Sequence, residues 1–313
     1  MISRRLLRIK ALMSYYSYFV SENSSIAKAE KELFFSINKT YELYHYLMAL
    51  VVEISDYARN RIDIARQKLV PTHEDLNPNT RFIDNKVIEL LRKNEHLQQF
   101  LNNTKLSWVN YPELIKKLYT KLKETEEYQT YMAQTRESYT QDLEFVILIF
   151  TNHIVENELL HQILEEQSIY WNDDIEFVVG MIIKTIKSFT PVYPERNRMM
   201  PLYKNTDDED FVKKLFRKSI INYETYKDLI EKYTKHWDIE RIAFVDILLM
   251  ILAITEFIEF STIPVKVTLN EYIEICKFYS TNKSSPFING ILDKIIAQLR
   301  SENKIIKIGR GLS

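Results

Sequence analysis

The stretch IAFVDILLMILAIT, residues 242–255, is the most apolar run in this chain of 313 residues. It is shorter than the roughly 20 residues that a membrane-spanning helix needs, and Asp246 interrupts it. Charged residues flank it closely on both sides. A helix that is apolar all round is buried inside a larger protein. We therefore predict that residues 242–255 form the central helix of a soluble helical bundle.

Apolar residues elsewhere in the chain also follow a helical spacing. They recur every three or four residues between the eight prolines, and no segment alternates in the manner of a strand. Residues 27–68 predict one long helix or a kinked pair, and residues 139–167 predict another long helix. The first helix has an apolar stripe made of Ile2, Leu6, Ile9, Met13, Tyr16 and Val20. The predicted fold class is therefore all-α.

Composition excludes several kinds of site. The formal net charge is -1, so an RNA site would have to be a local patch. Cys276 is the single cysteine, which excludes an internal disulfide and a thiolate-rich metal site, and we expect it to be a small core residue. Glu158 and His161 have the Glu-x-x-His spacing of di-iron bundles, but the chain holds no second copy. We predict no metal, no cofactor and no enzymatic activity.

Helix boundaries are sharp in the last hundred residues. Asp238, with Trp237 before it, is predicted to cap the central helix. Residues 268–271, TLNE, match a capping box that would begin the next helix. Ser285 is predicted to cap the last helix, with Pro286 at its first position.

Gly290 lies one turn into that last helix. A glycine there costs roughly 0.5–1 kcal/mol relative to alanine, so some gain should offset it. The dipeptide Asn289-Gly290 is also a hairpin-turn sequence, but apolar residues at helical spacing continue through it. Close approach of another helix and close approach of a ligand both remain possible explanations. Phe287, in the same first turn, is either a core contact or part of a ligand site at the helix N-terminus.

The beginning of the chain is basic. Arg4, Arg5 and Arg8 lie on one side of the apolar stripe of the first helix, and Tyr15 and Phe19 follow on that side. Guanidinium groups pair with phosphates and aromatic rings stack on unpaired bases, so this face suits RNA. A solvated cationic face without a ligand is the alternative.

Three blocks near the end of the chain resemble the transcription antitermination factor NusB family. They follow one another in the order and at the spacing of that family: WDIERIAFVDILLMILAITEF (237–257), IPVKVTLNEYIEICKFYS (263–280) and SSPFINGILDKI (284–295). RRLLRIKALMSYYSY, residues 4–18, resembles the arginine-rich first helix of the family. The length of the chain resembles a longer type of this family that is associated with the Bacteroidetes.

The resemblance divides the chain into four parts. Residues 1–20 correspond to the basic first helix and residues 206–302 to the NusB-like helical core. Residues 21–205 are a helical insertion of unknown role, and residues 303–313 are a basic tail. The resemblance thus implies an all-α, NusB-like bundle of two helical subdomains with an additional helical insertion.

The resemblance also implies a function. Members of the family bind boxA RNA together with NusE, a ribosomal protein, and join other Nus factors on RNA polymerase in the cytoplasm. They suppress termination, notably in ribosomal RNA operons, and carry out no catalysis. A helical protein-binding adaptor that has lost RNA binding is the alternative interpretation.

Individual roles follow by position. The resemblance implies RNA contacts by Arg4, Arg5, Arg8, Lys283 and Phe287. It implies a NusE contact by Asp246, and we expect the basic first helix to lie beside the aromatic start of the last helix. Structural roles are implied for Trp237, Asn270, Glu271, Asn289, Gly290 and Asp293, with Asn270 and Glu271 capping between the subdomains.

Overall fold

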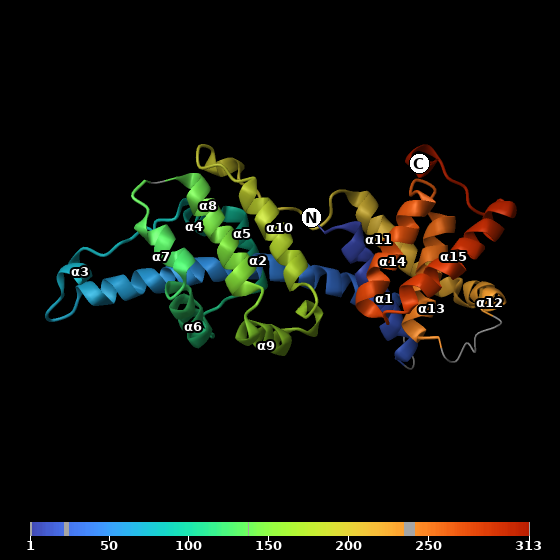
Figure 1. Ribbon diagram of the computed structural model, residues 1–313, viewed down its shortest axis with the longest axis horizontal. Coiled ribbons are helices and arrows are strands. Elements are labelled where there is room, and N and C mark those ends of the chain that lie inside the picture. The colour runs from blue at the N-terminus through green and yellow to red at the C-terminus, as the bar shows by residue number, and fades with distance from the viewer. Residues whose placement is uncertain (1, 22–24, 137, 235–241, 313) are drawn as a thin grey trace. The chain divides into compact units, whose positions relative to one another are not determined.

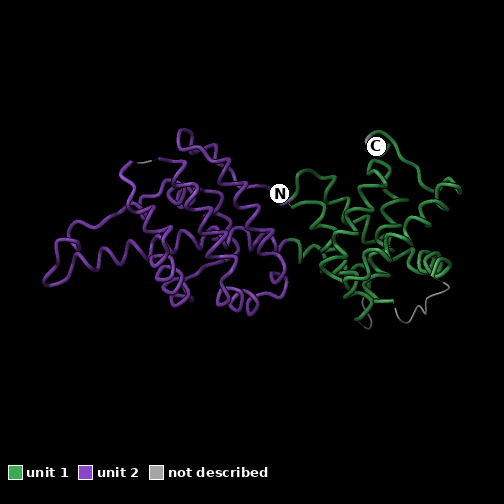
Figure 2. The backbone as a smooth tube through the Cα atoms, viewed as in Figure 1, with its two compact units in different colours: residues 1–37, 203–313 green, residues 38–202 purple. Residues whose placement is uncertain are grey.

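The computed structural model describes residues 2–21, 25–136, 138–234 and 242–312, and all regular elements within them are helical (Figure 1). The predicted all-α class is confirmed. The chain forms two compact units, unit 1 with residues 1–37 and 203–313 and unit 2 with residues 38–202 (Figure 2). The boundary near residue 37 falls within the long helix α2 (Ile26–Arg66), so this helix belongs in part to each unit. Among the described residues, no helix is both long and apolar enough to cross a bilayer.

Unit 1 is a bundle around one buried helix. Besides the first turns of α2, its helices are α1 (Arg4–Val20), α11 (Thr206–Ile221), α12 (Tyr223–Tyr233), α13 (Phe244–Glu259), α14 (Val265–Tyr279) and α15 (Ser284–Ser301). Every residue of α13 from Asp246 to Phe257 is buried, and α13 packs against the five other helices. The prediction of a central buried helix is confirmed. Its expected cap, Asp238 after Trp237, lies outside the described residues.

The first helix packs with a different phase from the predicted stripe. Leu7, Ala11 and Tyr15 are fully buried, and the Tyr15 hydroxyl donates to the Ser219 carbonyl at 2.8 Å. Tyr16, by contrast, is 44% exposed. The predicted apolar stripe therefore fails to match the buried face toward the end of α1. A pattern of apolar residues alone does not include the buried polar residues of this helix.

The predicted capping box at residues 268–271 is wrong. Helix α14 begins three residues earlier, at Val265, directly after Pro264. The Thr268 hydroxyl donates to Glu256 at 2.7 Å, and Glu271 accepts hydrogen bonds from Arg5. The two side chains that would have capped a helix are thus used in contacts between helices.

The last helix also begins earlier than predicted. Lys283 occupies the N-cap position of α15 and makes no capping hydrogen bond, while Pro286 is the third helical residue. The buried hydroxyl of Ser284 lies 3.0 Å from that of Ser280 and 2.8 Å from that of Thr281. These contacts fix the turn one residue ahead of the predicted cap at Ser285.

The segment after α15 returns to the end of α13. The Ile308 N–H donates to the Ser261 carbonyl at 3.0 Å, and the Lys307 ammonium donates to the Phe260 carbonyl at 2.8 Å. A short 3-10 turn, η5 (Gly309–Leu312), follows. A Cβ atom on Gly311 would overlap the carbonyl oxygen of Ser261, so this close approach requires glycine.

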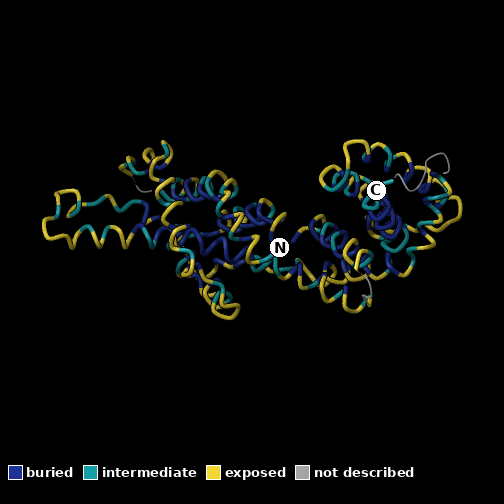
Figure 3. Tube along the Cα trace, turned by 90° about the horizontal axis from the view of Figure 1, so that it is seen from below, coloured by how far each residue is buried: buried dark blue, intermediate teal, exposed yellow. Residues whose placement is uncertain are grey.

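Unit 2 packs shorter helices on the remainder of α2. They are α3 (His73–Leu76), α4 (Lys86–Arg92), α5 (Glu95–Thr104), α6 (Pro112–Lys123), α7 (Glu126–Ala133), α8 (Tyr139–Leu148), α9 (Glu158–Gln167) and α10 (Ile175–Lys187), with the turns η1 (Ile149–Ile154), η2 (Ile169–Trp171) and η3 (Pro194–Arg196). Residues 43–52 of α2 are all buried, whereas its last turns and the segment after them are mostly exposed (Figure 3).

Two long helices were predicted outside the core, and the prediction is confirmed for one of them and wrong for the other. Helix α2 is a single helix of 41 residues. Residues 139–167 instead form α8, the π-helical turn η1 and α9. The break occurs because the Asn157 side chain accepts a hydrogen bond from the Leu160 N–H and so caps a new helix.

Candidate nucleic-acid interface

The three arginines of α1 have different surroundings, and Arg8 is the buried one. Its side chain is 3% exposed, and its Nε and Nη2 donate to the two oxygens of Glu256 at 2.8 and 2.6 Å. Burial alone would lower the pKa of Arg8, but the hydrogen bonds and charge of Glu256 outweigh it and raise that pKa. Separating a buried ion pair costs about 3–5 kcal/mol. This placement does not fit a direct contact of Arg8 with RNA.

Arg4 and Arg5 lie near the surface, and each pairs with a carboxylate of another helix. Arg5 is 50% exposed and donates twice to Glu271, at 2.9 and 2.8 Å. These hydrogen bonds lower the pKa of the Glu271 carboxyl. Arg4 is 39% exposed, donates to Asp208 at 2.9 Å and lies over the Phe211 ring. An exposed ion pair contributes only about 0–1 kcal/mol, so Arg5 can exchange its carboxylate for a phosphate at small cost. The Asp208 partner of Arg4 is buried, so separating that pair costs more.

The start of α15 is anchored to the other end of α13. Asp246, 4% exposed, accepts a hydrogen bond from the Ser280 hydroxyl at 2.5 Å and so fixes the junction between α14 and α15. Lys283 is exposed at this junction, and Phe287 is half-buried in the first turn of α15. Asp246 thus offers almost no surface to a partner protein.

The buried arginine of α1 and the start of α15 are anchored at different points of α13. Glu256 and Asp246 are ten residues apart, which places the arginine anchor and the α15 anchor about 15 Å apart along α13. Helix α1 spans this interval, because the rings of Tyr16 and Phe19 lie 5.8 and 6.1 Å from Phe244 at the start of α13. The candidate surface is therefore a strip along α1 that leads from the exposed arginines toward the start of α13, where Asp246 anchors the α14–α15 junction.

Comparison with known proteins identifies the family of the bundle that carries this strip. Residues 192–297 match the model of the NusB family. A transcription antitermination protein NusB from Salinibacter ruber is 40% identical over 113 residues, which cover 36% of this chain and 71% of that protein. This chain belongs to the NusB family. A NusB from Chloroherpeton thalassium is 41% identical over 104 residues, which cover 33% of this chain and 49% of that protein. No solved structure matches.

The family match falls on α11–α15 and the loop before them. Proteins of the NusB family act in transcription antitermination and are not enzymes. Nearly all of unit 2 lies outside the matched residues, so this unit is an addition to the NusB domain. Charge differs between the units: unit 1 has 23 Lys and Arg against 19 Asp and Glu, and unit 2 has 19 against 24. The excess positive charge therefore lies in the NusB-like unit.

The residues to which the NusB resemblance gave structural roles differ in what they do. Trp237 lies outside the described residues. Asn270 is exposed on α14, which does not fit a cap between subdomains. Asn289 donates to Asp293 at 3.2 Å, one turn along α15. A Cβ atom on Gly290 would meet nothing within 4 Å, so the explanation by close helix packing is wrong.

Sequence reasoning missed the residues that hold the arginines in place. Glu256, fully buried, accepts hydrogen bonds from both Arg8 and Thr268. The available signal was an acidic residue inside an otherwise apolar helix, because a buried carboxylate must be paired. Tyr16 was assigned to the apolar stripe, yet it is the exposed aromatic residue of α1 nearest to α13.

Proposed function

We propose that this NusB-family protein is a cytoplasmic transcription antitermination and elongation factor that binds boxA-type RNA together with NusE. In this role it joins RNA polymerase and other Nus factors and promotes readthrough of terminators, especially in ribosomal RNA operons. The observation that carries the proposal is the match of residues 192–297 to the NusB family, which coincides with the bundle that holds the arginines of α1.

The proposed RNA surface uses the residues that can reach solvent. Arg5 would bind a phosphate by exchanging its partly exposed partner Glu271, and the 39% exposed Arg4 guanidinium would bind another while it keeps its buried partner Asp208. Tyr16 and Phe287 would stack on unpaired bases, and Lys283 would bind a further phosphate. Arg8 is left out because its guanidinium is buried against Glu256.

The main test measures binding of boxA RNA by fluorescence anisotropy at several salt concentrations, with and without NusE. We expect Arg5→Glu to weaken binding by about tenfold or more and to reduce the salt slope by about 1. Arg61→Glu, the same charge change at an exposed position of unit 2, is the matched control and should have a smaller effect. Equal affinities of wild type and Arg5→Glu would remove α1 from the proposed surface.

A second variant tests the aromatic contribution. Phe287→Ala should cost about 1–3 kcal/mol of RNA binding through lost stacking. Phe278, 82% exposed at the end of α14, provides the control Phe278→Ala. Circular dichroism should show that both variants remain folded. If both lose affinity equally, the contribution is not specific to the start of α15.

The NusE contact assigned to Asp246 needs a gentler change than charge reversal. Asp246→Lys would bury an ammonium at the α14–α15 junction, whereas Asp246→Asn keeps the shape and the hydrogen bond from Ser280. We expect Asp246→Asn to weaken NusE binding in calorimetry without unfolding the protein. Unchanged NusE affinity would leave Asp246 with a purely structural role.

One observation favours the alternative, a helical adaptor that does not bind RNA. Each of the three arginines of the first helix already pairs with a carboxylate of the same chain. An adaptor of this kind would bind NusE with normal affinity and would show no salt-dependent binding of boxA RNA, so the same titration separates the two functions.

A further inference from the structure

A polar pocket of about 420 Å³ lies in unit 2, at the start of α8. Arg81, from the segment before α4, forms part of its wall, and Ser138 and Thr135, from the segment before α8, form another part. This pocket lies outside the residues that match the NusB family.

Arg81, which lines this pocket, carries a buried donor without a hydrogen-bond partner. Its side chain is nine-tenths buried, and its Nε is a buried atom with no hydrogen-bond partner. The Nη atoms are occupied: Nη1 donates to the Arg136 carbonyl at 3.1 Å, and Nη2 donates to the side chains of Gln134 and Gln141 at 2.9 and 3.1 Å. An unpaired buried N–H is costly, and that of a guanidinium is suited to an oxyanion.

The N-terminus of α8 opens into the same pocket. Ser138 has extended N-cap geometry, with φ -144° and ψ 123°, but its side chain makes no capping hydrogen bond. The first N–H groups of a helix point outward with partial positive charge, and a bound anion satisfies them. Two independent features, the helix end and the unpartnered Arg81 Nε, therefore favour the same class of ligand.

Nearby charges limit the strength of this site. Asp142 lies 3.9 Å from Arg81, but its oxygens accept hydrogen bonds from the Lys86 N–H at 2.8 Å and the Tyr131 hydroxyl at 2.7 Å. Asp84 is an exposed carboxylate of the wall, and the Lys86 ammonium pairs with Glu89. Because the charges of the wall nearly balance, directed hydrogen bonds would have to supply most of the affinity.

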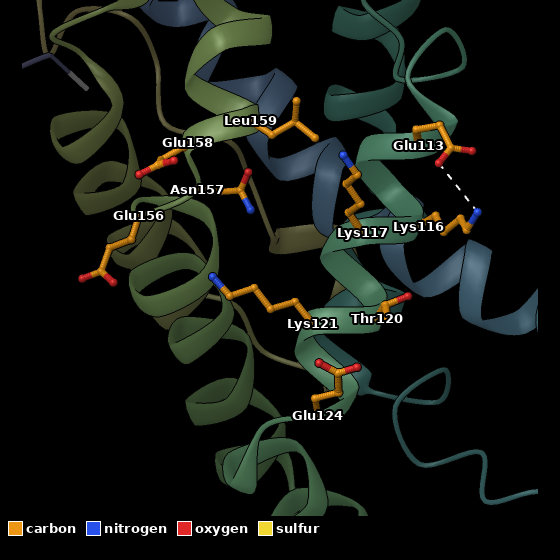
Figure 4. A pocket seen from close by; sticks show the side chains of 10 residues that line it. All are labelled: Glu113, Lys116, Lys117, Thr120, Lys121, Glu124, Glu156, Asn157, Glu158 and Leu159. Carbon is orange, nitrogen blue, oxygen red and sulfur yellow. Dashed lines mark ion pairs between the residues drawn. The ribbon is translucent and has the colours of Figure 1, made fainter.

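A larger pocket of about 740 Å³ in unit 2 provides a contrast (Figure 4). Lys117 and Lys121 extend from α6 toward the segment that carries Asn157 and Leu159, but both lysines are exposed. Asn157 already caps α9 through the Leu160 N–H. This pocket has cations and a helix end but no buried donor that lacks a partner among its described lining residues.

We propose that the pocket at the start of α8 binds the oxygens of a phosphate group. The Arg81 Nε–H and the first backbone N–H groups of α8 donate to them, and Thr135 and Ser138, which line the pocket, add contacts through their hydroxyls. The phosphate belongs either to a small molecule such as a nucleotide or to a single-stranded RNA backbone. This site is independent of the RNA surface proposed for unit 1.

Ser138→Asp is the decisive variant because it separates binding from folding. A carboxylate at this N-cap would satisfy the helix N–H groups from within, which should maintain or raise the melting temperature, and would repel an anion. Binding is measured by calorimetry with inorganic phosphate, adenosine monophosphate and a single-stranded RNA at constant ionic strength. We expect saturable phosphate binding by the wild type and a loss of about tenfold or more in Ser138→Asp.

Two further variants complete the test. Arg81→Lys keeps the charge but removes the Nε–H, and it should also weaken phosphate binding by about tenfold. Lys121→Ala, in the larger pocket, should leave phosphate affinity unchanged. Weakened binding of phosphate and nucleotide with unchanged RNA affinity would identify a small ligand, and a parallel loss for RNA would identify the RNA backbone. Absence of saturable phosphate binding by the wild type, or wild-type affinity in Ser138→Asp, would overturn the proposal.

Discussion

The α13 core of unit 1 and residues 41–45 of α2 in unit 2 bury polar groups in different ways. At the centre of unit 1, the fully buried Glu256 pairs with Arg8. At residues 41–45 of α2 in unit 2, uncharged groups pair instead: the Tyr44 hydroxyl lies 2.7 Å from that of Thr185, and His45 Nδ1 lies 2.8 Å from the Tyr41 carbonyl. The core of unit 1 therefore depends on two charges that must stay together, and this part of unit 2 depends on a histidine that must stay neutral.

This difference teaches that a buried charge is tolerated where an oppositely charged partner and further hydrogen bonds satisfy its polar atoms. Arg8 makes two hydrogen bonds to one carboxylate, and Thr268 satisfies that carboxylate further. His45 instead pairs with the neutral Tyr41 carbonyl; burial lowers its pKa to about 4, and it stacks on Phe100 with ring centroids 3.7 Å apart. Each of the following predictions tests one side of the contrast.

The largest expected effect is in unit 1. Glu256→Ala leaves the Arg8 charge buried without its partner, which should lower the free energy of unfolding by about 3–5 kcal/mol. Hydrogen exchange of the α13 amides, compared with those of α2, would show whether the loss is confined to unit 1. Glu271→Ala, at the partly exposed end of the same network, is the control and should cost less, about 1 kcal/mol. A loss below that of the control would mean that the pair does not stabilise unit 1.

The next effect is a pH dependence in unit 2. The pKa of His45 is lowered from 6.5 to about 4, so the unfolded chain takes up a proton first as the pH falls. The associated stability is present above pH 6.5 and is lost between about pH 6.5 and 4, by up to about 3 kcal/mol.

Urea unfolding at several pH values, read from α2 amide exchange, would measure this loss, and His45→Gln should reduce it. His73→Gln, at an exposed histidine, should leave the pH dependence as in the wild type. If His45→Gln and the wild type lose stability in parallel over this range, the neutral core histidine does not set the acid limit of unit 2.

The smallest effect should appear equally in both units. A Cβ atom would meet nothing within 4 Å at Gly290 in α15 or at Gly180 in α10. Gly290→Ala and Gly180→Ala should therefore each raise the free energy of unfolding by about 0.5–1 kcal/mol, measured by urea denaturation. Gly311→Ala is the opposite control, because its Cβ would overlap the Ser261 carbonyl and should destabilise unit 1. A destabilising Gly290→Ala would show that this glycine has a packing role after all.

Sequence alone predicts the features that depend on apolar content. The central position of α13 follows from its unbroken apolar run, and α2 follows from its length and spacing. The face that α1 buries could not be predicted in this way, because Arg8 and Lys10 are buried and a pattern of apolar residues treats them as exposed. The capping box at residues 268–271 failed because the same side chains suit both a cap and a tertiary contact.

The candidate site, too, was predicted from the sequence only in part. The family resemblance indicated which positions to examine, but it could not reveal that Arg8 is enclosed while Arg5 reaches solvent. That distinction depends on carboxylates about 250 residues away in sequence, whose position is set by the packing of α13 and α14. The pocket around Arg81 was not predicted, because no local motif joins it to the start of α8.

The pairing of Arg8 with Glu256 also constrains when unit 1 can form on the ribosome. The two residues are 248 positions apart, and all of unit 2 is encoded between them. At about 5–20 residues per second, Glu256 is added roughly 12–50 s after Arg8. During that delay α1 lacks its Glu256 partner and must stay accessible to α13. Unit 2 therefore has time to fold before Arg8 and Glu256 can pair and the NusB bundle can form.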